Sequence, residues 1–301
     1  MIEMIFQYIY EFEIGSAYKL FNSQFMSSVI GALAGAFAGA YAAHKIATSA
    51  KRREFLEAQI RSTNVAISSV FLTCNYALGL KGQHVLPLYT SYISEKKRFE
   101  NSINNHQADG SIHFSMDLKT LHMPFVPFND VSRIIQEQVN LRGRPLALVP
   151  TIQNSLTSLQ ASLEYMNKLI EQFKTNFQGL REEHKLKIYF GLPLPDGNVH
   201  QEYSDTLLMV YQYTDNVIFF SSLLCSDLVA HGDKIRAQYR KEFGRHIEKT
   251  TSPDFKTDKA EKLMPNAKDY EDWLKMFQEH PQEQSWFGRL RLLVKLSKRM
   301  Q

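Results

Sequence analysis

The segment Phe25 to Ala43, FMSSVIGALAGAFAGAYAA, decides how the whole chain is organised, because it contains no Asp, Glu, Lys or Arg. An α-helix rises about 1.5 Å per residue, so about 20 such residues cross the roughly 30 Å hydrocarbon core of a bilayer. The segment predicts a single transmembrane helix over residues 23–46, preceded by a short outer or interfacial segment, residues 1–22.

Two alternatives exist for this segment. Ala, Gly and Ser dominate it, so a buried helix of a soluble protein would have a similar composition. Ala40-Tyr41-Ala42 resembles the cleavage site of a signal peptide. However, the stretch before the segment is long and acidic, whereas signal peptides begin with a short basic region.

The flanking charges predict an orientation. Basic residues collect on the cytoplasmic side of membrane helices. Residues 1–44 carry three glutamates and one lysine, whereas the segment is followed by His44, Lys45, Lys51, Arg52 and Arg53. We therefore expect a cell inner-membrane protein with its N-terminus outside and its C-terminal region in the cytoplasm.

Gly31, Gly35 and Gly39 lie four residues apart, on one face of this helix. Small residues at this spacing let two helix backbones approach closely in a membrane. The pattern predicts membrane-helix association through these three glycines. A homo-oligomer is the expected result, and a different protein partner stays open.

The fold class predicted for the chain is mainly α, with the membrane helix continuing into a cytoplasmic helical bundle or coiled-coil-like domain, residues 47–249. Leu56 to Ala77 alternate apolar spacings of four and three, which is typical of a helix seam. Gly79 and Gly82 predict a turn into a second helix, and so an αα-hairpin. From Ile112 to Leu118, apolar and polar residues alternate, which predicts a small β insertion at about 110–128.

Two further segments have strong helical patterns. From Ile152 to Phe177 the three–four spacing extends over more than three heptads. One helix of an intramolecular bundle is the favoured interpretation, and an intermolecular coiled coil is the alternative.

Residues 206–226 are apolar enough to raise the question of a second span, but Asp215 lies near their middle. A carboxylate there costs about 2.5–3.5 kcal/mol in a bilayer, so a buried core helix is favoured.

The C-terminal region is predicted as a polar linker, residues 250–265, and C-terminal helices with a basic amphipathic tail, residues 266–301. Between Trp286 and Met300 there are five basic residues and no acid, and they predict membrane-surface contact: Arg289, Arg291, Lys295, Lys298 and Arg299. A terminal helix packed on its own domain is an equal alternative.

No motif for catalysis, cofactor binding or metal binding occurs. We therefore assign no catalytic residue, no cofactor, no metal ligand and no nucleic-acid partner. Cys74 and Cys225 are expected to be buried free thiols, since both lie in apolar helical patterns. Asp205, Asp215 and Asp227, which recur along one apolar helix, are expected to be hydrogen-bonded or partly exposed rather than free buried acids.

Three functions remain open at this point. The first is a membrane-anchored scaffold or sensor with a cytoplasmic helical interaction domain, whose partners are the lipid bilayer, other copies of the chain and a cytoplasmic protein. The alternative is a membrane-perturbing or pore-forming effector of a bacterial defence (anti-phage, abortive infection) or toxin system. The third is an anchored enzyme. The layout resembles that of bacterial inner-membrane proteins, some of which act as membrane effectors in anti-phage defence, and this resemblance is one of architecture alone.

Overall fold

The computed structural model describes residues 24–104, 114–123, 126–255 and 257–277. They divide into two compact units. Within the described residues, the first unit comprises 24–58 with 239–245, and the second comprises 59–238 with 246–277.

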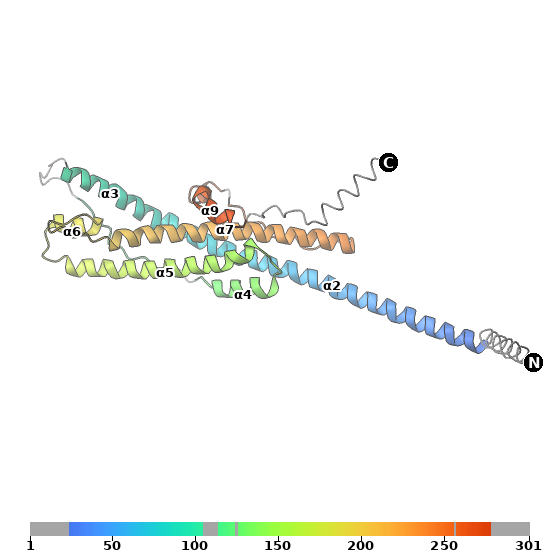
Figure 1. The fold of residues 1–301 in the computed structure, drawn as a ribbon. Helices are drawn as coiled ribbons and strands as arrows, with labels where there is room; N and C mark the ends of the chain where they lie inside the picture. Colours follow the sequence, from blue (N-terminus) through green and yellow to red (C-terminus); the bar gives the residue numbers. More distant parts are fainter. Residues whose placement is uncertain (1–23, 105–113, 124–125, 256, 278–301) are drawn as a thin grey trace, which may run out of the picture. The chain divides into compact units, whose positions relative to one another are not determined.

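The described residues are mainly helical and contain no β-strand, which confirms the mainly α fold class. The elements, most of which Figure 1 labels, are α2 (Gln24–Leu80), the π-helix η1 (Lys81–Val85), α3 (Leu86–Asn104), α4 (Phe128–Gln138), α5 (Arg144–Asn176), α6 (Glu182–Phe190), α7 (Glu202–Phe243), α8 (Asp258–Glu261), the 3-10 helix η2 (Ala267–Tyr270) and α9 (Glu271–Lys275).

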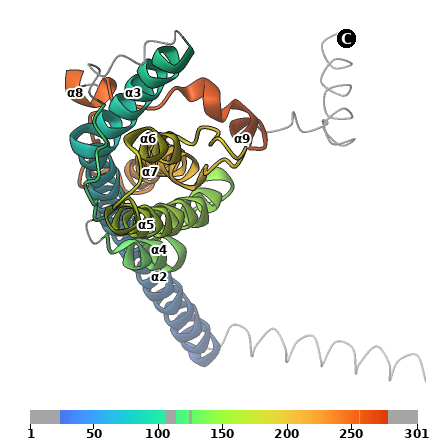
Figure 2. The same ribbon diagram turned by 90° about the vertical axis from the view of Figure 1, so that its left-hand side faces the viewer.

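Helix α7 forms the centre of the second unit. In the end-on view of Figure 2 it is surrounded by α3, α5, α6 and α9. Its side chains Leu207, Val210, Val217 and Leu224 are buried in one continuous apolar core. The prediction that residues 206–226 form a core helix is therefore confirmed.

Helix α5 packs its apolar seam against the same core. Leu156, Leu163, Met166 and Ile170 are all buried within the chain. The interpretation of this seam as one helix of an intramolecular bundle is confirmed, since the side chains that an intermolecular coiled coil would use are already covered.

The predicted turn at Gly79 and Gly82, and with it the αα-hairpin, is wrong. The helix continues through this point as η1, where the N–H of Leu86 donates to the carbonyl of Lys81, five residues back. A glycine inside a helix costs about 1 kcal/mol relative to alanine. The wider π turn nevertheless leads directly into Pro87 in the first turn of α3. It also directs Lys81 into the core, where tertiary contacts offset that cost.

The predicted β insertion is also wrong for the part of 110–128 that the structure describes. Residues 114–123 are extended without a partner strand. Phe114, Met116 and Leu118 do pack against the core, as the alternation predicted. The backbone of Leu121 bonds instead to the Asn167 side chain, whose Nδ2 donates to the carbonyl oxygen at 2.7 Å and whose Oδ1 accepts from the amide at 2.9 Å. One amide side chain thus replaces a strand ladder at this point.

After α7, residues 246–277 form a strap that returns along the second unit. Asn64 of α2 accepts a hydrogen bond from the Thr251 amide at 2.9 Å. Further on, the Tyr270 ring stacks on Phe219 with centroids 3.8 Å apart. These contacts hold the strap on the faces of α2 and α7.

Candidate functional site

The most unusual surface in the described residues is the N-terminal part of α2. It belongs to the one described helix that is long and apolar enough to cross a membrane, and none of its most apolar stretch is buried. Leu33, Phe37 and Tyr41 are 54%, 74% and 69% exposed. Because a core helix of a soluble protein would be mostly covered, the structure favours the membrane prediction over the buried-helix alternative.

The glycine face of this helix is open. At Gly31, Gly35 and Gly39 an added Cβ would meet no atom within 4 Å. Among the described residues, nothing therefore fills the space over the predicted association face. Leu33 and Phe37 lie on the opposite face of the helix.

Basic residues cluster where α2 meets the last turns of α7, in the first unit. Residues 44–58 and 239–245 carry seven cations and three carboxylates. We call the seven cations the basic junction: Lys45, Lys51, Arg52, Arg53, Arg240, Lys241 and Arg245. Two contacts join the helices here. Arg52 Nε lies 3.2 Å from Glu242 Oε2, and the Tyr239 hydroxyl donates to Glu57 Oε1 at 2.9 Å.

Glu57 also organises the basic junction from within α2. Arg53 Nε donates to the same carboxylate oxygen at 2.9 Å. Hydrogen bonding to Glu57, followed by that to Tyr239, raises the pKa of Arg53. These contacts fix the position of the guanidinium, although pairs this exposed contribute little to stability.

Two shallow grooves flank Phe243 at the basic junction. One, of about 420 Å³, is lined by residues that include Tyr41, Arg52 and Glu242. The other, of about 520 Å³, is lined by Lys45, Ile46, Ser49, Ala50, Arg53, Phe243 and Arg245. The second groove, which we call the cationic groove, has three cations and no carboxylate among its lining residues.

The interior of the second unit contains a buried ion pair that the sequence did not reveal. Lys81 Nζ lies 2.6 Å from Asp215 Oδ1 and donates to the carbonyl of Leu263 in the strap at 2.9 Å. It also lies 5.3 Å from the Tyr211 ring centroid. Burial raises the pKa of Asp215, and the bond to Lys81 opposes that change. One ammonium therefore joins η1, α7 and the strap.

The three aspartates of α7 for which the sequence made a prediction are placed as expected. Asp215 pairs with Lys81, Asp227 accepts from Arg144 Nε at 3.0 Å, and Asp205 is exposed. Each acid is bonded or solvated, which confirms the expectation that none is a free buried acid. Charge pairing accounts for Asp215 and Asp227, and solvation accounts for Asp205.

The two cysteines are buried and free, as expected. Burial raises the pKa of the Cys74 thiol to about 12 and also raises that of Cys225. Both are therefore unreactive thiols. Within the described ranges, no group of three or more His, Cys, Asp or Glu side chains is placed to hold a metal ion.

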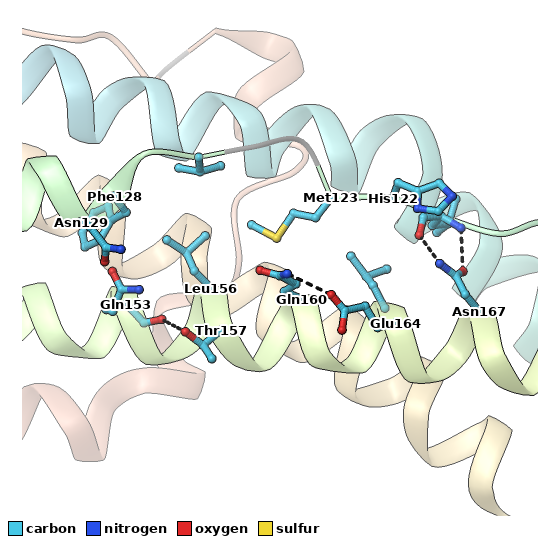
Figure 3. Close-up of a pocket in the computed structure, with 13 residues that line it drawn as sticks. His122, Met123, Phe128, Asn129, Gln153, Leu156, Thr157, Gln160, Glu164 and Asn167 are labelled. Atoms are coloured by element: carbon cyan, nitrogen blue, oxygen red, sulfur yellow. Dashed lines mark hydrogen bonds between the residues drawn. The ribbon is translucent and has the colours of Figure 1, made fainter.

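A pocket of about 420 Å³ lies between α5 and the extended segment before α4. Figure 3 shows its polar wall, which α5 supplies with Gln153, Gln160, Glu164 and Asn167. Most of these groups are already engaged. Gln160 Nε2 donates to Glu164 Oε1 at 2.9 Å, and Asn167 holds the extended segment. The Thr157 hydroxyl in the lining donates to the backbone carbonyl of Gln153 at 3.0 Å.

The sequence predictions cover only part of these features. The glycine face was found from its spacing, whereas the five basic tail residues lie outside the described residues. Lys81 was missed because it stands in a polar, glycine-containing stretch, Gly79 to His84, that is typical of a solvated turn. The cationic groove was missed because Arg245 and Lys45 are 200 residues apart in sequence.

Comparisons with known proteins give no family for this chain: no family model, no curated protein and no solved structure matches it. The function must therefore be argued from the site alone.

Proposed function

We propose that the chain is a single-pass inner-membrane protein in which residues 23–46 cross the bilayer and a cytoplasmic helical domain acts as a scaffold or sensor. The observation that carries the proposal is the exposure of the apolar part of α2. In water this surface would be an aggregation hazard, whereas in lipid its side chains are solvated. The cytoplasmic helical domain follows directly on the same helix.

The basic junction supports the proposed orientation. The part of the first unit that comes after the apolar segment contains seven cations and only three carboxylates. These residues come from two distant parts of the chain. The positive-inside preference places such a cluster in the cytoplasm. With one span, the N-terminus then lies outside.

Insertion is tested by placing charges in the apolar segment. Replacing Leu33 and Phe37 with Arg adds about 2.5–3.5 kcal/mol per residue to the cost of insertion. We expect this variant to move from the carbonate-resistant membrane pellet to the supernatant or to be degraded. Val65→Arg with Leu72→Arg is the matched control, since both residues are exposed apolar positions on the second-unit part of α2. If both variants stay in the pellet, the span is refuted.

Self-association through the glycine face is the second part of the proposal. The open groove over Gly31, Gly35 and Gly39 lets another copy of the helix approach closely. Gly35→Leu fills the groove and separates the backbones while leaving insertion intact, because Leu is favoured in lipid. We expect less oligomer on crosslinking in membranes for Gly35→Leu and no change for Phe37→Leu on the opposite face. Equal oligomer yields from both would refute the glycine contact.

A pore-forming effector of a bacterial defence or toxin system is the second candidate function. The observation in its favour is that a helix rich in Gly, Ala and Ser packs closely and can line a polar path when several copies assemble. The same variant separates the two functions. If expression of the unmodified chain is toxic and Gly35→Leu relieves the toxicity, the pore is favoured, whereas indifferent growth favours the scaffold.

A further inference from the structure

The cationic groove lies at the end of the apolar segment. Its first cation, Lys45, follows Ala43 by two residues, which is about 3 Å of helix rise. Ser49 and Arg53 follow at four-residue steps, on the same face of α2 and up to about 15 Å beyond Ala43. The polar headgroup layer begins where the hydrocarbon core ends and is about 5–8 Å thick on each side. The groove therefore spans this layer, and its long basic side chains can reach back into it.

The charges of the groove are available to a ligand. Among the described residues, neither Lys45 nor Arg245 is paired with a carboxylate. Arg53 is bonded to Glu57. If the charge of Glu57 is counted with those of Lys45, Arg53 and Arg245, the groove still has a positive excess. The neighbouring groove differs, because Glu242 occupies it and pairs with Arg52. Lys45 lines both grooves, but only the cationic groove has no carboxylate among its lining residues, and so it is the one better suited to an anion.

The cationic groove also has apolar lining residues, which can contact the glycerol and acyl part of a phospholipid. Ile46 is 70% exposed, and Phe243 borders the groove beside it. A free inorganic anion would gain nothing from these side chains. A phospholipid would place its phosphate between the cations and its glycerol and upper acyl carbons against Ile46.

We propose that the cationic groove binds the phosphate headgroup of an anionic phospholipid of the cytoplasmic leaflet, with Lys45 and Arg245 as its two main contacts. This site rests on the proposed membrane span, because the span brings the groove to the headgroup layer. Its consequence is that the C-terminal end of α7, 200 residues away in sequence, is held at the membrane surface by a lipid shared with α2. Arg245, which follows α7, is thereby a ligand for the lipid phosphate and not only a solvated charge.

The test measures retained lipid on the full-length chain. The protein is purified in a mild detergent, mixed with phosphatidylglycerol or phosphatidylcholine, and the bound lipids are counted by native mass spectrometry. Each basic residue at an anionic surface contributes about a fivefold preference. We expect Lys45→Gln with Arg245→Gln to lower phosphatidylglycerol affinity by about twenty-fivefold, without changing phosphatidylcholine retention. The circular dichroism spectrum should be unchanged, because both side chains are exposed.

The matched control is Lys51→Gln with Lys241→Gln. It removes the same charge from the same two helices but changes no residue that lines either groove. We expect less than about a threefold loss, the size of a screened long-range effect. Equal losses from the two double variants would overturn the groove in favour of diffuse attraction, and no loss from Lys45→Gln with Arg245→Gln would overturn it outright. Displacement of the lipid by excess inorganic phosphate would mean a free-anion site and would also overturn the proposal.

Failure of the span and failure of the groove give different results. Carbonate extraction of the Lys45→Gln, Arg245→Gln variant reports the span alone, and we expect it to remain in the membrane pellet. An unmodified chain that is extracted by carbonate refutes the span whatever lipid it retains. A chain that resists extraction but shows no preference for phosphatidylglycerol refutes only the groove.

Discussion

Lys81→Met tests whether the buried ion pair holds the strap to the second unit. The change keeps the length of the side chain but leaves Asp215 without its counterion, 2.6 Å from where the ammonium was. Breaking a buried pair by removing one partner costs about 3–5 kcal/mol. The Asp215 side chain keeps 15% of its surface exposed, so we expect the lower end, about 3 kcal/mol. For a unit of this size that lowers Tm by about 6–12 °C.

The pH dependence of this loss follows from the direction of the pKa change. Burial already raises the pKa of Asp215 although Lys81 opposes it, so without Lys81 the rise must be larger. A carboxyl whose pKa is higher in the folded than in the unfolded chain lowers stability as pH rises from the unfolded pKa through the folded one. The deficit of Lys81→Met is therefore largest at neutral pH and shrinks as acid protonates Asp215.

The assay is thermal unfolding of the full-length chain in mild detergent, followed by tryptophan fluorescence. Trp273 of the strap packs on Phe220 with ring centroids 4.9 Å apart, so its emission reports strap docking. Lys268→Met, at an exposed strap lysine, is the control. The double change Lys81→Met with Asp215→Leu should recover most of the loss, because no charge is then left buried. A Tm of Lys81→Met within about 2 °C of the unmodified chain at neutral pH would refute the reasoning.

Further predictions concern the strap, the core and the tail. Tyr270→Phe keeps the stack on Phe219 but removes the hydroxyl bond to Asn216 Oδ1 at 3.0 Å, so it should cost about 1 kcal/mol in thermal unfolding, whereas Tyr270→Ala should cost at least twice as much. Gly82→Leu should release the strap, read out as a shift in tryptophan emission, because an added Cβ would lie 2.9 Å from Leu263 Cδ1 and the rest of the new leucine side chain would need still more room. Replacing the five basic tail residues with Gln should weaken binding of residues 51–301 to anionic vesicles at low salt, by about 1 kcal/mol for each residue that contacts the surface; unchanged binding would reject the tail as a membrane contact. These residues are Arg289, Arg291, Lys295, Lys298 and Arg299.

Helical periodicity correctly predicted which side chains of a single helix are buried together. The seam from Ile152 to Phe177 and the apolar run around Val217 are both core, because spacing alone decides which residues share a face. The exposed apolar segment of α2 was predicted from its length and its lack of charged residues, which are also local features. Such features need no knowledge of what packs against them.

The errors arose where contacts distant in sequence decide the local structure. Gly79 and Gly82 have turn-forming character, but the chain stays helical there, and Lys81 of the π turn pairs with Asp215 of a distant helix. The alternation from Phe114 to Leu118 correctly predicted which side chains face the core. It could not show that a side chain, Asn167, would take the place of a partner strand.

The same limit applies to the site. The glycine face of α2 is local, so its spacing was visible, whereas the cationic groove needs Lys45 and Arg245 to meet across 200 residues. Single-sequence patterns contain no signal for that pairing. A basic cluster after a membrane segment predicts orientation, but the depth and lining of a groove come only from the fold.

The central claim is that residues 23–46 cross the membrane with the helical domain inside. Single cysteines test it directly, because Cys74 and Cys225 are 0% and 1% exposed and give little background labelling. Sealed spheroplasts carrying Ser16→Cys or Lys268→Cys are treated with a membrane-impermeant maleimide before and after lysis. We predict that Ser16→Cys is labelled in sealed spheroplasts and that Lys268→Cys is labelled only after lysis. Labelling of Lys268→Cys in sealed spheroplasts, or protection of Ser16→Cys until lysis, would contradict the claim.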